Sequence, residues 1–379
     1  MIYFDNSATT KPLDEVVKLV SDDLQNDELW GNPGSLHELG TSAYKAYIKA
    51  KEDIASCFSI REQELVFTSC ATESANTAIN GFLKRNKRNG RTIISTKTEH
   101  RATLSVLEKL SDEVFNVIYL NVGHDGKPDL EQLASAIDGD TSLLCFTHVN
   151  NETGAILPLK EIIDIRNSKN RNTAIYIDFV QSAGKLKLDL RELGIELASF
   201  SAHKFHGLKG SGLLYIKNGV RIDPFILGGG QQNGMRSGTE SLYLSRSTAL
   251  ALKLSQTDID EHLKTVSEIN SYLRTELVKR KATILSPEDA LPYVLNVSFE
   301  GFESETMLHC LERYNIYVST ISACSSKTKK ISYVLEAMGV DRKLATNAVR
   351  LSFSRFNTMD EAKTFIEKID EIYQLFALR

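Results

Sequence analysis

Few cysteines and no long apolar segment occur in this chain of 379 residues. The five cysteines are odd in number and widely spaced, and no Cys-x-x-Cys occurs, which argues against a disulfide framework or a cysteine zinc site. No uncharged apolar run approaches the ~18 residues that read as a membrane span, so we expect no membrane contact. The N-terminus lacks the charged-then-apolar pattern of a signal peptide. We therefore expect a cytoplasmic protein, in which a reactive thiol can stay free.

An excess of one charge is also lacking. Lys and Arg together number 45, Asp and Glu number 49, and the formal net charge is −4. This balance excludes a strongly basic nucleic-acid-binding protein as the default, and we expect no direct nucleic-acid contact. Apolar residues make up 42% and charged residues 25%, as in ordinary globular proteins. At ~150 residues per domain, the length predicts two or three domains, or one large and one small.

Between residues 64 and 217, short apolar runs alternate with amphipathic helical stretches. Several runs are continuously apolar, as in strands that are covered on both faces. This alternation predicts an α/β domain with a mostly parallel sheet. The expected strands are Leu65–Thr68, Thr92–Ser95, Asn116–Leu120, Leu143–Val149, Ala174–Asp178, Leu197–Ser201 and Gly212–Ile216, and the expected helices include Glu73–Lys84, Leu130–Ile137 and Leu159–Asn167.

After Glu240 the pattern changes to one long helical stretch, which reaches about Lys281. A compact α+β pattern follows it and predicts a smaller second domain. We expect the large domain to cover residues 13–255 and the small domain residues 256–379, with residues 1–12 joined to the small one. The elements expected in the small domain are strands Val294–Phe299, Ile316–Ser319 and Val349–Phe353 and helices Ser304–Tyr314 and Met359–Phe376.

Polar side chains of types that are useful in catalysis follow five of the seven expected strands. In parallel α/β sheets, ligands bind at the carboxyl ends of the strands. The sequence therefore predicts a ligand site at this edge of the sheet. The polar groups are Ser69–Glu73, Glu99-His100, Asn150–Glu152, Asp178 with Gln181, and Ser201–Lys204.

Asp178 and Lys204 each end or follow one of these apolar runs. A carboxylate at the mouth of a buried strand needs a positive or hydrogen-bonding partner, and the protonated pyridine nitrogen of pyridoxal phosphate is one candidate. A helix N-cap is the alternative role for Asp178. A lysine at a strand end can lose water, which lowers its pKa and frees its amine for a Schiff base. A surface loop lysine is the alternative for Lys204.

Cys70-Ala71-Thr72 opens a helix after a strand, where main-chain amides and the Thr72 hydroxyl suit a phosphate. A simple helix start with Thr72 as its cap is the alternative. His100 could stack on an aromatic cofactor or move a proton, or it could be structural. His203 and His206 lie three residues apart, but no third ligand stands nearby, so we expect no metal site.

Two residues near the C-terminus carry chemistry of other kinds. Cys324 lies in a polar segment of small residues, and three lysines shortly after it would favour its thiolate. An incidental loop cysteine is the alternative. Arg350 is a charged residue inside an apolar strand, so it needs a partner or faces a cleft. Its partner is either a substrate carboxylate, held by two hydrogen bonds, or a structural ion pair.

Several short motifs follow one another along nearly the whole chain. The most specific are Ser201–Lys204 with Gly207, and Arg236–Glu240. The others are Tyr3–Thr10, Gly31–Pro33 with His37, Phe67–Glu73, Glu99-His100, His148–Gly154, Asp178 with Gln181–Lys185, and Ser322–Ser326. In this order they resemble the cysteine desulfurases of the class V aminotransferase family. Ser322–Ser326 favours the NifS/IscS-like branch.

The resemblance implies a fold type I, pyridoxal 5′-phosphate (PLP)-dependent large domain with a mostly parallel seven-stranded sheet, plus the smaller α+β domain. It implies that Lys204 binds PLP covalently and carries protons, that Asp178 binds the pyridine nitrogen, and that Gln181 binds the phenolic oxygen. His100 would stack on the ring and assist proton transfer. The resemblance implies further contacts to the phosphate, from Ala71, Thr72, Ser201 and His203. In a homodimer, Thr239 would reach the phosphate of the neighbouring subunit. Asn151 would contact the cofactor and, with Arg350, the substrate carboxylate.

The resemblance also implies a reaction. L-Cysteine becomes L-alanine, and Cys324 takes the sulfur as a persulfide and delivers it to an acceptor protein. That acceptor could be an iron–sulfur scaffold, a tRNA-thiolation enzyme or a thiamine-pathway protein. A selenocysteine lyase, another class V aminotransferase-like enzyme and a non-catalytic binding module are the alternatives. Cys70 departs from the family pattern, which usually has glycine there and so leaves more room beside the phosphate.

Overall fold

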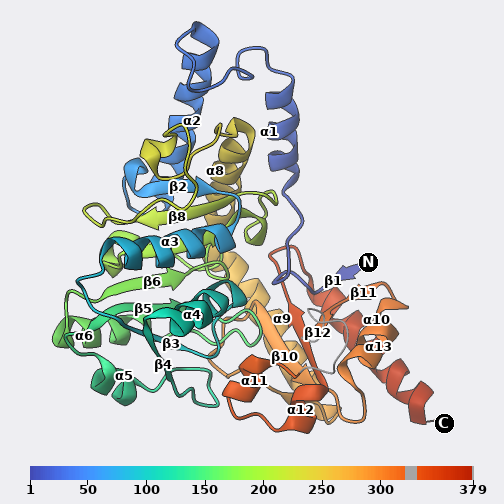
Figure 1. Cartoon of the computed structure of the whole chain (residues 1–379). Coiled ribbons are helices and arrows are strands. Elements are labelled where there is room, and N and C mark those ends of the chain that lie inside the picture. The colour runs from blue at the N-terminus through green and yellow to red at the C-terminus, as the bar shows by residue number, and fades with distance from the viewer. Residues whose placement is uncertain (321–330, 378–379) are drawn as a thin grey trace.

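The computed structural model describes residues 1–320 and 331–377, and its larger sheet has seven strands in the order β2-β8-β7-β6-β5-β3-β4 (Figure 1). Neighbouring strands are parallel except around β8, which runs antiparallel to β2 and β7. The predicted mostly parallel seven-stranded sheet is therefore confirmed. The strands are β2 (Leu65–Thr68), β3 (Thr92–Thr96), β4 (Asn116–Leu120), β5 (Thr141–Thr147), β6 (Ala174–Asp178), β7 (Leu197–Ser201) and β8 (Gly212–Ile216).

Helices cover both faces of this sheet (Figure 1). In β6, Tyr176 packs in the core beneath α3 and α4, whereas Ile175 and Ile177 pack in the core that α2 and α8 share. Successive side chains of a strand point to opposite faces, which explains why the strand is apolar throughout. The helices of this part are α1 (Asp14–Leu24), α2 (Glu38–Cys57), α3 (Ala71–Arg85), α4 (Arg101–Glu113), α5 (Leu130–Ala136), α6 (Leu159–Lys169), α7 (Leu190–Leu193) and α8 (Leu242–Gln256), with short 3₁₀ turns at Glu62–Glu64, Ala202–Lys204 and Gln232–Gly234.

A second, antiparallel sheet has the order β12-β13-β10-β9 and its own apolar core. The chain begins beside it, because β1 pairs in parallel with β11, and Figure 1 shows the N-terminus next to these late elements. This is the smaller α+β part. Its elements are β1 (Ile2–Tyr3), α9 (Ile259–Lys279), β9 (Thr283–Ile284), β10 (Val294–Ser298), α10 (Ser304–Glu312), β11 (Ile316–Tyr317), β12 (Ser319–Thr320), α11 (Tyr333–Ala337), α12 (Arg342–Thr346), β13 (Ala348–Ser352) and α13 (Met359–Ala377).

Several expected elements differ from the structure. The expected strand Ile316–Ser319 is two short strands in different sheets, β11, which pairs with β1, and β12, which pairs with β13. The long helix from Glu240 to Lys281 is two helices, because the chain turns at Asp258, which has a φ of 53°. The expected strand Leu143–Val149 ends at Thr147, although Val149 is fully buried and so continues the apolar pattern. The division at residue 255 stays a prediction. Within the described residues, no helix is long and apolar enough to cross a membrane.

Gly212 lets the start of β8 approach the start of α3. A Cβ at this position would lie 2.5 Å from the Cys70 carbonyl carbon and 2.7 Å from its Cα. We expect Gly212→Ala to lower the free energy of unfolding by about 1–3 kcal/mol, the usual cost of overpacking. Urea unfolding measures the change. Gly139→Ala is the control, because its Cβ would meet no atom within 4 Å; equal unfolding midpoints for the two variants would contradict the prediction.

Candidate active site

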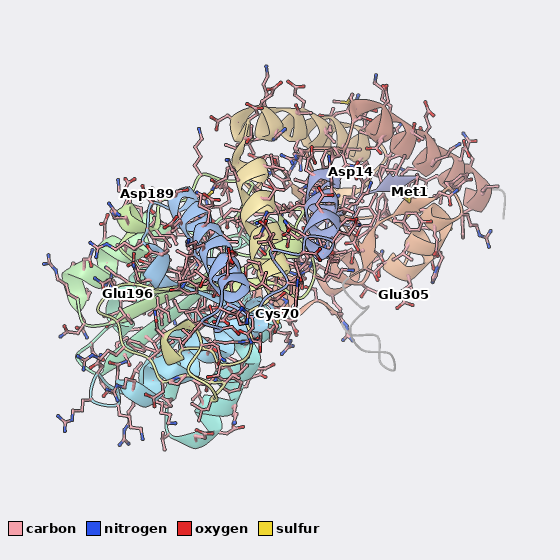
Figure 2. All side chains as sticks on the ribbon, turned by 90° about the horizontal axis from the view of Figure 1, so that it is seen from above. Met1, Asp14, Cys70, Asp189, Glu196 and Glu305 are labelled. Carbon is pink, nitrogen blue, oxygen red and sulfur yellow. The ribbon has the colours of Figure 1, made fainter. Side chains whose placement is uncertain are left out.

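A cavity of about 280 Å³ opens at the carboxyl end of the large sheet. Its wall combines strand ends, the first residues of α3 and α4, and the N-terminal segment. Figure 2 labels Cys70, one of the wall residues, near the middle of the molecule. The sequence-predicted residues that line the cavity are Ala71, Thr72, His100, Asn151, Asp178, Gln181, Ser201, His203 and Lys204.

Asp178 presents a buried carboxylate to this cavity. It ends β6, is 4% exposed, and its Oδ1 accepts a hydrogen bond from the Val180 amide at 2.8 Å. Burial raises the pKa of Asp178, although His100, the Val180 amide and Lys204 act in the opposite direction. Within residues 1–320 and 331–377 no cation forms an ion pair with it and Oδ2 has no hydrogen-bond donor. The carboxylate therefore suits a ligand that brings a charged N–H.

Lys204 lines the cavity from the 3₁₀ turn Ala202–Lys204, which directly follows β7. Its Nζ donates to the main-chain oxygens of Ser7 and Ala8, the latter at 2.7 Å. Burial, with the nearby charge of Arg350, lowers the pKa of Lys204 to about 8. A fraction of about one tenth is then uncharged at pH 7, which an ordinary lysine does not approach. This amine can act as a nucleophile.

His100 has the structural role that the sequence left open, and its role toward a cofactor stays a prediction. It caps α4, and its Nδ1 accepts a hydrogen bond from the Ala102 amide at 3.1 Å. An accepting Nδ1 assigns the ring proton to Nε2. Burial lowers the pKa of His100, so the ring is neutral near pH 7. A neutral ring on the cavity wall can lie against an aromatic ligand and donate from Nε2.

The start of α3 is an open anion site on the same wall. Cys70 is the N-cap, so the alternative in which Thr72 caps this helix is wrong, and the Cys70 side chain makes no capping hydrogen bond. Within the described residues, the amides of Ala71 and Thr72 have no hydrogen-bond acceptor. Free amides and the helix dipole favour a phosphate here. Cys70 has an extended backbone, with φ −171° and ψ 168°, which any residue adopts, so the departure from glycine costs no strain.

Ser201, the last residue of β7, and His203, in the turn that follows, also line the cavity. The His203 Nδ1 lies 3.1 Å from the Thr9 hydroxyl. Burial, with the charges of Lys204 and Lys209, lowers the pKa of His203 to about 4. The ring is therefore neutral near pH 7 and can offer one N–H to an anion. Among the described residues, no group of three or more His, Cys, Asp and Glu could hold a metal ion.

Arg350 does not line the cavity but lies behind Asn151, which does. Its guanidinium donates to the Asn151 carbonyl at 3.1 Å and to Asp5 Oδ1 at 2.8 Å. The structural ion pair that the sequence left open is therefore present, with Asp5 as its partner. The Arg350 Nε is buried and has no hydrogen-bond partner among the described residues. A role in holding the substrate carboxylate stays a prediction.

Thr239 and Cys324 were also predicted for the site. Thr239 is exposed and does not line the cavity of its own chain, so its contact with a neighbouring subunit stays a prediction. Cys324 lies outside the described residues.

Sequence reasoning missed other wall residues. Ser7 contributes a main-chain carbonyl, which accepts from both Lys204 and Gln181. Side-chain patterns do not show a carbonyl, and Ser7 reaches the cavity only because the N-terminal segment crosses to the large sheet. Thr147 was hidden inside an expected strand that ran two residues too far. The wall residues not assigned from the sequence are Ser7, Ala102, Thr147 and Val180.

The cavity residues fit PLP. The buried Asp178 carboxylate has an open oxygen for a pyridinium N–H, and Lys204 supplies an amine of lowered pKa. The free amides at the start of α3 suit the phosphate. Gln181 also lines the cavity, and its Nε2 donates to the Ser7 carbonyl at 3.0 Å.

Comparison with known proteins gives the same family over almost the entire chain. Residues 2–365 match the family model described as aminotransferase class-V. A NifS/IcsS protein homolog of Lactobacillus delbrueckii subsp. bulgaricus is 40% identical over 100% of this chain and 98% of its own length. The cysteine desulfurase IscS of Methanosarcina thermophila is 37% identical over 98% of this chain and 92% of its own length.

Solved structures agree with these relatives. A NifS-like protein has a TM-score of 0.93 at 38% identity and covers 99% of both chains. SspA, described as in complex with cysteine, has a TM-score of 0.82 at 27% identity and covers 94% of this chain and 100% of its own. The chain therefore belongs to the PLP-dependent class V aminotransferase family, as a relative of its NifS/IscS-like cysteine desulfurases.

Proposed function

We propose that the protein is a cysteine desulfurase, which converts L-cysteine to L-alanine with PLP. One observation carries the proposal: the Lys204 amine and the buried Asp178 carboxylate share a cavity with the open N-terminus of α3. These three features match the aldehyde, the ring nitrogen and the phosphate of PLP. Relatives that are named cysteine desulfurases, and the cysteine bound to SspA, support the substrate.

When bound, PLP supplies an electron sink that stabilises negative charge on the substrate Cα. Asp178 holds the ring nitrogen protonated, because its ionised form gains a partner that the cavity otherwise lacks. Ala71, Thr72, Ser201 and His203 hold the phosphate. Thr239 reaches the phosphate site of a second subunit.

Asn151 and Arg350 position the substrate. Asn151 contacts the substrate carboxylate, and Arg350, which donates to the Asn151 carbonyl, supplies the positive charge beside it. The Lys204 amine moves the Cα proton, and the Ser7 and Ala8 carbonyls hold that amine in place. His100, which is neutral and protonated at Nε2, donates a proton inside the cavity.

Cys324 accepts the sulfur. The carbon–sulfur bond of L-cysteine breaks, a sulfur–sulfur bond forms at Cys324, and alanine leaves with a proton in place of the sulfur. The sulfur then passes from Cys324 to an acceptor protein, for which an iron–sulfur scaffold, a tRNA-thiolation enzyme and a thiamine-pathway protein are the candidates.

A homodimer in the cytoplasm completes the proposal. Two apolar side chains, Phe225 at 58% and Leu227 at 78% exposure, line a hollow of about 730 Å³. This hollow shares Thr72, His100 and Ala102 with the cofactor cavity. An interface at this place would cover the apolar residues and bring a second chain to the phosphate end. A sedimentation mass of one chain would rule it out.

Cys324→Ala tests the reaction. We expect the variant to bind PLP and show its visible colour, because Cys324 takes no part in holding PLP. We expect alanine formation from L-cysteine to fall by at least 100-fold, since the sulfur acceptor is absent. Full activity would contradict the desulfurase proposal. Cys310→Ala is the control, and turnover of L-selenocysteine and of amino-acid/keto-acid pairs separates the selenocysteine lyase and aminotransferase alternatives.

The pH dependence of PLP capture tests Lys204. Only its uncharged amine reacts, and burial lowers its pKa to about 8. We therefore expect the capture rate to rise about tenfold per pH unit below 8 and to level off above it. Stopped-flow absorbance of the apoprotein measures this rate, and borohydride should fix PLP on Lys204. A rate that continues to rise to pH 10 would show an ordinary lysine.

A further inference from the structure

Lys185 is a buried lysine that the proposed reaction does not use. It is 6% exposed, and its Nζ donates to Gln181 Oε1 at 3.0 Å. It also lies 5.8 Å from the centre of the Tyr293 ring. No carboxylate of residues 1–320 or 331–377 forms an ion pair with it. A buried ammonium without a counter-charge is costly, so its contact with Gln181 needs a reason.

The turns after β6 bring these two side chains together. The chain there makes consecutive tight turns, in which the Ser182 and Ala183 amides both donate to the Phe179 carbonyl. Residues four apart in such a turn lie on one side. Gln181 reaches the cavity wall, and Lys185 lies behind it, outside the wall.

Two contacts give Gln181 a single amide orientation. Its Nε2 donates to the Ser7 carbonyl at 3.0 Å, which requires the nitrogen on that side. The Lys185 Nζ donates to Oε1, which places the amide oxygen on the side of Lys185, and the ammonium form has no acceptor that would suit the opposite orientation. Both requirements agree. The amide nitrogen has two hydrogens, and the one not given to Ser7 remains for the cavity.

We propose that Lys185 is a positioning residue, whose Nζ–H donor fixes the Gln181 amide so that an N–H, and not the carbonyl oxygen, faces the ring oxygen of PLP. This inference rests on the proposed function, which puts PLP in the cavity. A flipped amide would set its oxygen against an anionic oxygen, which is repulsive. The same orientation keeps the hydrogen bond from Gln181 to the Ser7 carbonyl, which also accepts from Lys204.

Stability alone does not account for Lys185. Replacement of a buried ion by an apolar side chain of similar size is often neutral or stabilising. Burial, with the charges of Lys204 and Arg350, lowers the pKa of Lys185 to about 7, and those two cations also disfavour a third positive charge here. If this position needed only a side chain that fills the space, methionine would fill it without the cost of burying a charge. The donor is therefore the property that matters.

The test measures the visible absorbance of bound PLP as a function of pH, together with its Kd. The Gln181 donor stabilises the deprotonated ring oxygen, so its loss should raise the titration midpoint by about one pH unit and weaken PLP binding about tenfold. We expect these changes in Lys185→Met and in Gln181→Ala. The double variant should match Gln181→Ala alone, because Lys185 acts only through Gln181. Lys185→Arg keeps its donors and should keep the wild-type midpoint.

Lys187→Met is the matched control, because Lys187 is 71% exposed on its side chain and pairs with Asp260 away from the cavity. It should leave both values unchanged. Thermal unfolding of the apoproteins checks folding, and Lys185→Leu is a second variant without a donor. A wild-type midpoint and Kd in either donor-free variant, or effects that add in the double variant, would overturn the inference. A wild-type protein that shows no visible band with PLP would instead overturn the proposed function.

Discussion

Removal of charged groups from water at the carboxyl edge of the large sheet is the constraint on which the site depends. The same burial acts on two groups with opposite sign. It raises the pKa of Asp178 and lowers the pKa of Lys204 to about 8, because in each case the charged form loses hydration. One ligand that brings a cationic N–H to the first group and a carbonyl carbon to the second relieves both costs. The cavity is thus prepared for its ligand before binding.

Much of the large sheet could be predicted from sequence, because its strands are buried on both faces. β6, for example, has the predicted bounds, since an apolar run flanked by polar residues allows little else. The turn at Asp258 could not be predicted, because the helical periodicity continues through it and only the backbone changes. The end of β5 could not be predicted either, because the apolar pattern continues to Val149, which is buried although it lies beyond the strand.

The candidate site also has residues that could be predicted from the sequence and residues that could not. Residues that bring side chains to the cavity from strand ends, such as Asp178 and Lys204, could be predicted because the fold class fixes where strand ends meet. Ser7 could not be, since it contributes a carbonyl from the other end of the chain. The position of Arg350 behind Asn151 depends on how the two sheets meet, and no local pattern contains that information. The family resemblance implies a role for each site residue, whereas the hydrogen bonds of the structure show which polar groups are free to bind a ligand.

The N-terminal segment connects the two sheets through main-chain contacts. The Ser7 amide donates to Ser352 Oγ of β13 at 2.8 Å, and the Thr10 amide donates to the His203 carbonyl at 2.9 Å. The Ser7 carbonyl is therefore held between the small sheet and the turn that carries Lys204. Because Lys204 and Gln181 share this one acceptor, a shift of the small sheet would move both groups together. The geometry of the candidate PLP site thus depends on Ser7 and Thr10 as well as on the large sheet.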